Sequence, residues 1–349
     1  MWKHLKKNKL ARLSLVVLGG LYFLAFFADF FAPYHYDDED IMYRWAPPTR
    51  IHFINVKKGI FWPYIYGYKR SIDEYYRCIY SVDKEKIYPV RFFIRGFKYK
   101  LFGLWEFDYH LFGVKGGRIH LLGADLKGRD VFSRLLYGAR ISLSIGLIGV
   151  AISFFIGIII GGISGYFSGW VDNVLMRVVE MMMMVPAFYL MLALRASFPP
   201  NMSSTQVYIL IVVILSLIGW ASIARVIRGM CLSLREREFV LAAKASGLSN
   251  FKIIIHHILP HTLSYAIVAI FLSIPGYIVG EAGLSILGLG IQEPQASWGN
   301  MLSLAGGIVN IKFYPWILMP GFLILITSIC FNIVGEALRD VLDPKRKIF

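Results

Sequence analysis

Six apolar segments, each long enough to cross a bilayer, alternate with polar stretches along the 349-residue chain. A membrane-spanning helix needs about 20 mostly apolar residues. The segments occupy residues 10–31, 139–165, 174–197, 207–230, 262–290 and 315–337. An even number of spans returns the chain to the side on which it began. The pattern therefore predicts an all-α polytopic membrane protein with both termini on one side.

Basic residues beside the first and last spans indicate which side that is. They are Lys3, Lys6, Lys7, Lys9, Arg12, Arg339, Lys345, Arg346 and Lys347. Positive charges close to membrane ends favour the cytoplasmic side, so both termini are expected there. The first apolar run is of spanning length and no small-residue cleavage motif follows it, so residues 1–31 are predicted to remain as a signal-anchor helix.

Composition agrees with a membrane protein, because 57% of the residues are hydrophobic and the mean hydropathy is +0.58. The net charge of +15 raises the question of nucleic acid. However, the basic residues flank spans and no basic–aromatic binding module accompanies them, so no nucleic-acid partner is expected. The three cysteines follow neither a disulfide framework nor a metal-knuckle spacing.

Residues 32–138 are predicted to be an external insertion between the first two spans. Residues 32–120 combine many tyrosines and phenylalanines with β-branched residues, which favours a small, partly β subdomain on the outer face of the membrane. We interpret its aromatic residues as packing residues or interface anchors. Its many basic residues do not oppose this placement, because the charge rule weakens for loops longer than about 60 residues.

The remaining organisation follows from the spans. Residues 1–31 form the cytoplasmic N-tail and first span, 139–338 a five-helix core, and 339–349 a cytoplasmic C-tail. Inside the spans, Arg177 and Glu180 are spaced as a helix-end pair, and Glu281 is placed to line a cavity or to bond to a neighbouring helix. Three prolines can kink their helices: Pro186, Pro275 and Pro320.

The polar stretch from Arg235 to Pro260, called the 235–260 loop below, lies between two spans and falls on the cytoplasmic side by the span count. Its residues from Glu238 to Ser246 are good helix formers. Gly247 can adopt the left-handed conformation that ends a helix. A second helix, Phe251–Ile258, is expected to be capped by Ser249 or Asn250 and broken by Pro260.

The spacing of this loop resembles the segment by which permease subunits of ABC importers dock onto cytoplasmic ATPases. The resemblance implies that the loop transmits force through Glu238, Ala242, Ala243, Gly247, Leu259 and Pro260. The sequence departs from the family pattern at Leu241, where many members carry Glu, and at His257, where many carry Ile.

Four further stretches resemble C-type permeases of oligopeptide and dipeptide importers, within the binding-protein-dependent peptide/nickel family. They are Leu122–Arg140, with Ala124 in place of the usual Thr, Gly165–Asn173, Leu284–Gly290 with Trp298-Gly299, and Leu338–Asp340 with Asp343-Pro344. Together they cover about residues 121–345, so the chain is identified as a member with the type I importer fold of six transmembrane helices. The insertion is longer than in the simplest members.

The Leu122–Arg140 signature places both signs of charge near the predicted outer surface. Its candidate site residues are Gly123, Asp125, Gly128, Arg129, Asp130 and Arg140. The charges are interpreted as individually weak surface ion pairs that clamp the segment to the second span, or as contacts for an external binding protein. The glycines supply turn geometry. If the segment supports the external gate, Arg129→Ala lowers uptake at normal membrane abundance.

The resemblance implies a permease subunit that moves peptides across the cytoplasmic (inner) membrane by alternating access, with nickel or another small metal complex as the alternative cargo. Its implied partners are a second permease in a heterodimer, two ATPases, a periplasmic or extracellular solute-binding protein, and membrane lipid. The chain has no P-loop motif, so ATP and Mg are expected on the ATPases, and no cofactor or enzymatic activity is expected in this chain.

Two other classes of membrane protein make different demands on the sequence. An intramembrane enzyme needs convergent catalytic groups, and the three histidines His256, His257 and His261 lack an H-E-x-x-H pattern. His257 and His261 are four residues apart, but the expected helix break at Pro260 separates them. A secondary transporter should show inverted repeats with interrupted spans, and none is evident in the sequence.

Overall fold

The computed structural model describes residues 8–54, 62–75, 77–101, 104–199 and 201–342. The chain divides into two compact units, and each is described separately. One unit comprises Met1–Gly19, Leu143–Leu284 and Ile324–Phe349, and is called the core unit below. The other, called the sheet unit, comprises Gly20–Ser142 and Ser285–Leu323.

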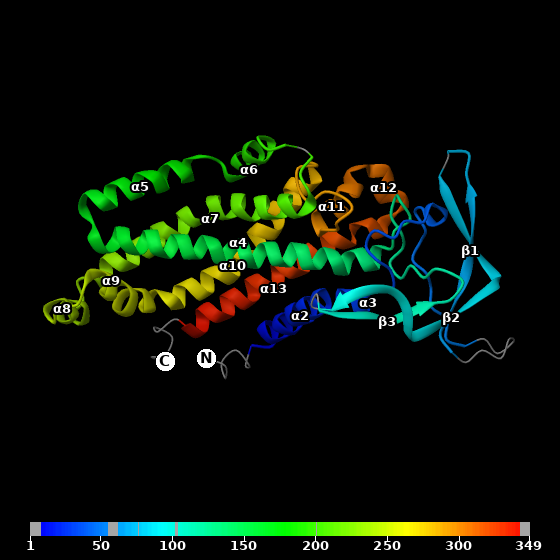
Figure 1. The fold of residues 1–349 in the computed structure, drawn as a ribbon, viewed down its shortest axis with the longest axis horizontal. Helices are drawn as coiled ribbons and strands as arrows, with labels where there is room; N and C mark the ends of the chain where they lie inside the picture. The colour runs from blue at the N-terminus through cyan, green and yellow to red at the C-terminus, as the bar shows by residue number, and fades with distance from the viewer. Residues whose placement is uncertain (1–7, 55–61, 76, 102–103, 200, 343–349) are drawn as a thin grey trace. The chain divides into compact units, whose positions relative to one another are not determined.

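Helices account for most of the described chain (Figure 1). They are α2 (Lys9–Phe26), α3 (Ala28–Phe31), α4 (Val131–Phe167), α5 (Gly169–Met184), α6 (Ala187–Ala196), α7 (Ser204–Leu234), α8 (Glu238–Ala245), α9 (Asn250–Ile253), α10 (Leu259–Ile286), α11 (Trp298–Ser303), α12 (Ile308–Phe313) and α13 (Met319–Leu342). Among the described residues, five helical segments are long and apolar enough to span a membrane, or up to six if a bent pair counts as one. This agrees with the predicted polytopic fold.

The bent pair is the third predicted span, residues 174–197. It consists of α5 and α6, whose axes differ by 85° across the break at Val185 and Pro186. Val185 adopts an extended conformation (φ −82°, ψ 126°), as residues before proline prefer. Pro186 has no N–H to continue the helix, so the segment is interrupted here rather than gently kinked.

Close helix packing in the core unit depends on glycines of α4. A Cβ added to Gly161 would lie 2.5 Å from the carbonyl oxygen of Ala224, and one added to Gly165 would lie 2.6 Å from that of Arg228, both in α7. Small residues four apart let membrane helices approach closely. Figure 1 shows α4 and α7 running alongside each other. Trp220 of α7 packs with Met176 and Val179 of α5 in a buried cluster.

The sheet unit contains an antiparallel three-stranded sheet in the order β1-β2-β3, which confirms the prediction of a partly β insertion. The strands are β1 (Tyr64–Ile72), β2 (Cys78–Leu101) and β3 (Trp105–Val114). β2 is 24 residues long, so its first part pairs with β1 and its second part with β3. Ile65, Val90 and Ile119 form a buried cluster beneath the sheet.

Candidate coupling loop and ion-pair cluster

The 235–260 loop contains the predicted short helix and tight turn. Helix α8 is closed by hydrogen bonds from the N–H of Gly247 to the carbonyl of Lys244 (3.1 Å) and from the N–H of Leu248 to the carbonyl of Ala243 (3.3 Å). This pair of bonds is a Schellman cap, which requires a left-handed residue. Gly247 supplies it with φ +75°, and a Cβ there would meet no atom within 4 Å. The requirement at this position is therefore conformational.

Helix α8 has one buried side and one exposed side. Val240 and Ala243 are buried, whereas Glu238 and Ala242 are exposed. Five large apolar residues of the loop are also exposed, and they are called the coupling face below: Phe239, Leu241, Leu248, Phe251 and Ile255. The side chain of Phe251 is 71% exposed. Several exposed large apolar side chains within one short loop are a feature of protein–protein contact sites.

The prediction that Pro260 breaks the second helix was wrong. Helix α9 continues through a π-helical turn, Ile254–Ile258, into α10, so Asn250–Ile286 is continuously helical. The N–H of Leu259 donates to the carbonyl of Ile254, five residues earlier. This wider turn shifts the hydrogen-bond register just before Pro260. Proline has no backbone N–H to donate, so the helix has no hydrogen bond to form from that residue. Leu259 is half-buried and Pro260 is exposed at the start of α10.

The expected separation of His257 from His261 was wrong for the same reason, because the helix is continuous between them. The ring of His261 packs 4.9 Å from that of Phe239 on α8. Among the residues that the structure describes, no group of three or more His, Cys, Asp or Glu side chains is placed to hold a metal ion.

Two polar contacts connect the neighbourhood of the loop to α4 and α5. The hydroxyl of Tyr166 donates to Oδ1 of Asn250 (2.8 Å). Arg228, at the end of α7, donates to both carboxylate oxygens of Asp172, which also accepts from Ser164. Sequence reasoning did not assign Arg228 a role. A basic residue inside an apolar segment was the available signal, since such residues are usually paired.

The signature segment forms a buried ion-pair cluster in the sheet unit. Nε of Arg129 donates to Asp125 (2.7 Å) and its Nη2 donates to Glu293 (2.5 Å). Lys127 contacts Glu293 (3.0 Å) and Glu39 (2.8 Å). The side chain of Arg129 is only 1% exposed. The interpretation of these charges as surface ion pairs was therefore wrong, because loops distant in sequence cover them.

Electrostatics in this cluster favour the ionised carboxylate of Glu293. Burial alone would raise the pKa of Glu293, but the hydrogen bond and charge of Arg129, together with Lys127 and Arg134, lower it to about 2. Sequence reasoning missed both Glu293 and Glu39, since each lies far along the chain from the signature and neither carries a motif of its own.

The remaining signature residues anchor α4. Asp130 caps the helix by accepting from the N–H and hydroxyl of Ser133 (both 2.7 Å). Arg140 donates to Asp29 (2.6 Å) and to the carbonyl of Ala25 (2.7 Å), so it ties α4 to the end of the first span. These contacts match the clamp interpretation. Contact with an external protein stays a prediction.

The two signature glycines occupy the predicted turns. Gly123 and Gly128 have φ of +80° and +77°. A Cβ on Gly128 would lie 1.8 Å from the carbonyl oxygen of Asp40, so this turn admits no side chain. The backbone conformation and the close approach of Asp40 thus both require glycine here.

Residues 157–348 match the family described as the binding-protein-dependent transport system inner membrane component. The chain belongs to this family. Residues 1–48 match the N-terminal TM domain of oligopeptide transport permease C. The family membership predicted from the motifs is confirmed, and the chain is an inner-membrane permease component.

Curated relatives agree with this assignment. The dipeptide transport system permease protein DppC of Bacillus subtilis is 40% identical over 228 residues, covering 65% of this chain and 69% of the relative. The oligopeptide transport system permease protein OppC of Haemophilus influenzae is 41% identical over 227 residues, covering 65% and 70%. A solved structure of the MetNI methionine ABC transporter in inward-facing conformations is 16% identical, with a TM-score of 0.46, covering 60% of this permease and 96% of that chain.

Proposed function

We propose that this permease is the C-type half of an ATP-driven importer that carries peptides across the inner membrane by alternating access. It pairs with a second permease, two cytoplasmic ATPases and an external solute-binding protein. The cargo is proposed because the relatives above are named as dipeptide and oligopeptide permeases. The subunits that bind ATP and Mg are the partners, so the isolated chain should hydrolyse no ATP.

The geometry of the 235–260 loop is the observation that carries this proposal. A short helix with a closed C-terminal cap presents Phe239 and Leu241 of the coupling face, while the buried Val240 and Ala243 hold its other side against the rest of the core unit. A partner bound to this face would move α8 as a rigid lever, and the continuous helix from Asn250 to Ile286 would carry the movement into a span. In the proposed orientation, the loop and both termini lie in the cytoplasm.

The decisive experiment alters the C-terminal cap of α8 without altering the residues of the coupling face. Gly247→Ala in the complete transporter forces a side chain into a left-handed conformation, which costs about 1–2 kcal/mol. We expect cargo-stimulated ATP hydrolysis and uptake to fall together in reconstituted vesicles. Gly229→Ala, at an exposed helical glycine whose added Cβ also meets no atom within 4 Å, is the matched control and should leave both activities unchanged.

Equal activity of the two variants in fully assembled transporter would refute coupling through this loop. A separate measurement tests the cargo. The solute-binding protein that stimulates the transporter is purified, and the molecules that copurify with it are identified by mass spectrometry. Peptides are expected, whereas a nickel or other metal complex would replace the proposed cargo and leave the coupling mechanism standing.

A further inference from the structure

An aromatic groove in the sheet unit is used by neither the coupling loop nor the ion-pair cluster. Its volume is about 460 Å³, within the range of small-ligand pockets. Four phenylalanines from the end of the first span form one wall, and Tyr99, Phe107 and Tyr109 of the β2–β3 hairpin form the other. The described lining is almost entirely apolar.

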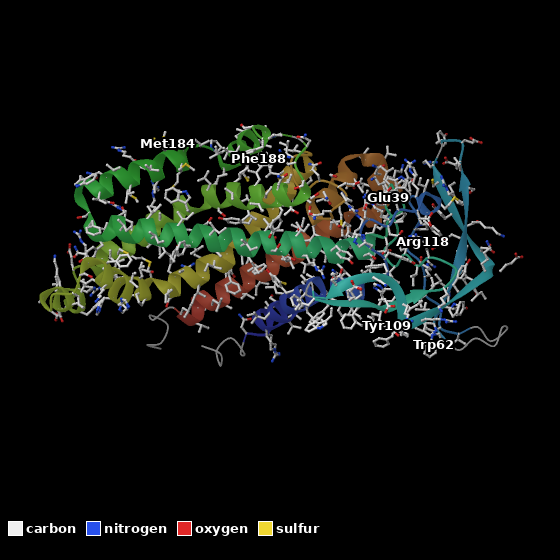
Figure 2. The ribbon with its side chains drawn as sticks, in the orientation of Figure 1. Glu39, Trp62, Tyr109, Arg118, Met184 and Phe188 are labelled. Atoms are coloured by element: carbon white, nitrogen blue, oxygen red, sulfur yellow. The ribbon has the colours of Figure 1, made fainter. Side chains whose placement is uncertain are left out.

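The two walls are held together by a specific contact. His110 of β3 is buried, and its Nδ1 lies 2.8 Å from the carbonyl oxygen of Asp29 in α3, which can only accept a hydrogen bond. Tyr99 donates its hydroxyl to the carbonyl of Tyr109 (2.9 Å), which fixes the hairpin wall. Figure 1 shows β3 lying beside α3, and Tyr109 is labelled at the hairpin in Figure 2. The groove is therefore a built feature of the fold.

The groove is continuous with a membrane-spanning surface. Phe23, Phe27, Phe30 and Phe31 belong to the predicted first span, and Phe23 is exposed. Phe93 of β2 extends the apolar surface, since its ring packs 6.2 Å from that of Phe30 and is itself exposed. Tyrosines such as Tyr99 and Tyr109 concentrate at the membrane–water interface, whereas the phenylalanines of the first span lie along its apolar segment. An occupant of the groove therefore comes from the hydrocarbon side of that interface.

The mouth of the groove carries an exposed arginine, on a hairpin with an excess of basic residues. Arg95 is 73% exposed, and its Nε donates to the hydroxyl of Tyr109 (3.1 Å), although it also faces Asp108 at 3.7 Å. From residue 90 to 114 the hairpin has four basic residues and two acidic ones. Exposed arginine beside an apolar groove complements a molecule with an anionic head and a hydrocarbon tail.

We propose that this groove binds one phospholipid of the surrounding membrane, with an acyl chain against Phe27, Phe31 and Phe107 and the phosphate at Arg95. The lipid lies in the leaflet on the sheet's side, which is the outer leaflet in the proposed orientation. A peptide occupant fits less well, because an extended backbone needs hydrogen-bond partners that an apolar lining does not offer. The bound lipid fixes the hairpin to the membrane surface.

The test uses the complete transporter in vesicles of phosphatidylethanolamine and phosphatidylglycerol. A trace of phosphatidylglycerol carries a photoactivatable diazirine midway along one acyl chain, and labelled residues are mapped by mass spectrometry after illumination. We expect the label on α3 and β3 to exceed that on Ile209 and Val213, which form an exposed apolar face of α7. Equal labelling would mean ordinary surrounding lipid and would overturn the proposal.

Variants of one groove residue provide the control. Phe107→Asp should lower the α3 label about tenfold, because an unpaired carboxylate is costly beside an acyl chain. Phe107→Leu keeps the groove apolar and should retain the label. Val82→Asp adds the same charge at an exposed apolar position of β2 outside the groove, and should also retain it. An equal loss in Phe107→Asp and Val82→Asp would contradict a site at this groove.

The head group and the alternative occupant are tested in the same vesicles. Phosphatidylcholine carries the same phosphate, but its choline cation cancels the net negative charge. Replacing the labelled lipid by phosphatidylcholine with the same diazirine chain should therefore lower the yield, and Arg95→Ala should remove that difference. A photoreactive amino acid at Phe107 that crosslinks to another subunit in place of lipid would identify a protein occupant and overturn the proposal. Neither outcome depends on the peptide cargo.

Discussion

At the scale of single residues, this permease separates two kinds of charge pair. Arg129 and Asp125 are buried and Arg129 also pairs with the partly exposed Glu293, whereas Arg177 and Glu180 form the predicted pair (3.1 Å), within α5 rather than at its end, with an arginine side chain that is 81% exposed. Removing one partner of a buried pair leaves an uncompensated charge, but exposed pairs contribute little. The same chemical change should therefore have very different consequences at the two sites.

Arg129→Ala should destabilise the purified transporter by about 3–5 kcal/mol, and Arg177→Ala by no more than about 1 kcal/mol. Thermal unfolding followed by the fluorescence of a thiol-reactive dye measures the difference. Uptake by the Arg129→Ala variant must be divided by the amount of chain in the membrane, because abundance itself should fall. Similar melting temperatures for both variants would show that the cluster is not effectively enclosed.

Acidification should weaken the cluster only at low pH. The pKa of Glu293 is lowered from 4.5 to about 2, so its ion pairs stabilise the folded state fully above about pH 4.5 and are lost as the pH falls towards 2. The melting temperature of the wild type should exceed that of Glu293→Gln by a constant amount between pH 7 and pH 5. The gap should then close at lower pH, and a gap that closes above pH 5 would be inconsistent with the lowered pKa.

At the scale of elements, whether a proline interrupts its helix depends on the neighbouring residues. Pro186 interrupts a span, Pro275 lies within α10, and Pro260 follows a π-helical turn that leaves the helix continuous. The sequence predicted the apolar segments, the α8 helix and the left-handed turn at Gly247, because these depend on local propensity. It could not predict the burial of Arg129, whose partner Glu293 is 164 residues away.

Helix packing predicts that replacing glycine by alanine changes stability in opposite directions at two positions. Gly161→Ala inserts a methyl group 2.5 Å from a backbone oxygen of α7, and overpacking of this kind costs about 1–3 kcal/mol. Gly276→Ala adds the same group within α10 where no atom lies within 4 Å, and should stabilise its helix by about 0.5–1 kcal/mol. Resistance to unfolding in detergent should fall for the first variant and hold or rise for the second.

At the scale of the whole molecule, family membership is shown by the comparisons, while the direction of the chain across the membrane is a prediction from its charges. The six predicted spans match the described residues if the bent pair of α5 and α6 counts as one span, because five other helical segments are long and apolar enough to cross a membrane. The insertion was correctly predicted to be partly β, but its groove could not be foreseen, since the groove joins a hairpin to a helix about 80 residues earlier.

Thiol labelling of intact cells tests the orientation. In a Cys78→Ser background, where the other two cysteines are buried, Lys98→Cys on the sheet should react with a membrane-impermeant maleimide. Ser246→Cys in the 235–260 loop should react only after permeabilisation. Both positions are exposed, so access to the reagent rather than burial decides the result. Reversed labelling would invert the proposed topology and remove the loop from the ATPases.

The break between α5 and α6 also determines what can lie beside the third span. Helix ends leave backbone N–H and C=O groups without partners in their own helix, and hydrocarbon offers none, so irregular backbone within a bilayer adjoins protein or water. Met184, 81% exposed, and Phe188 flank this break (Figure 2). Lipid can therefore surround the uninterrupted spans of this subunit. The interrupted third span must instead face another subunit or a hydrated passage.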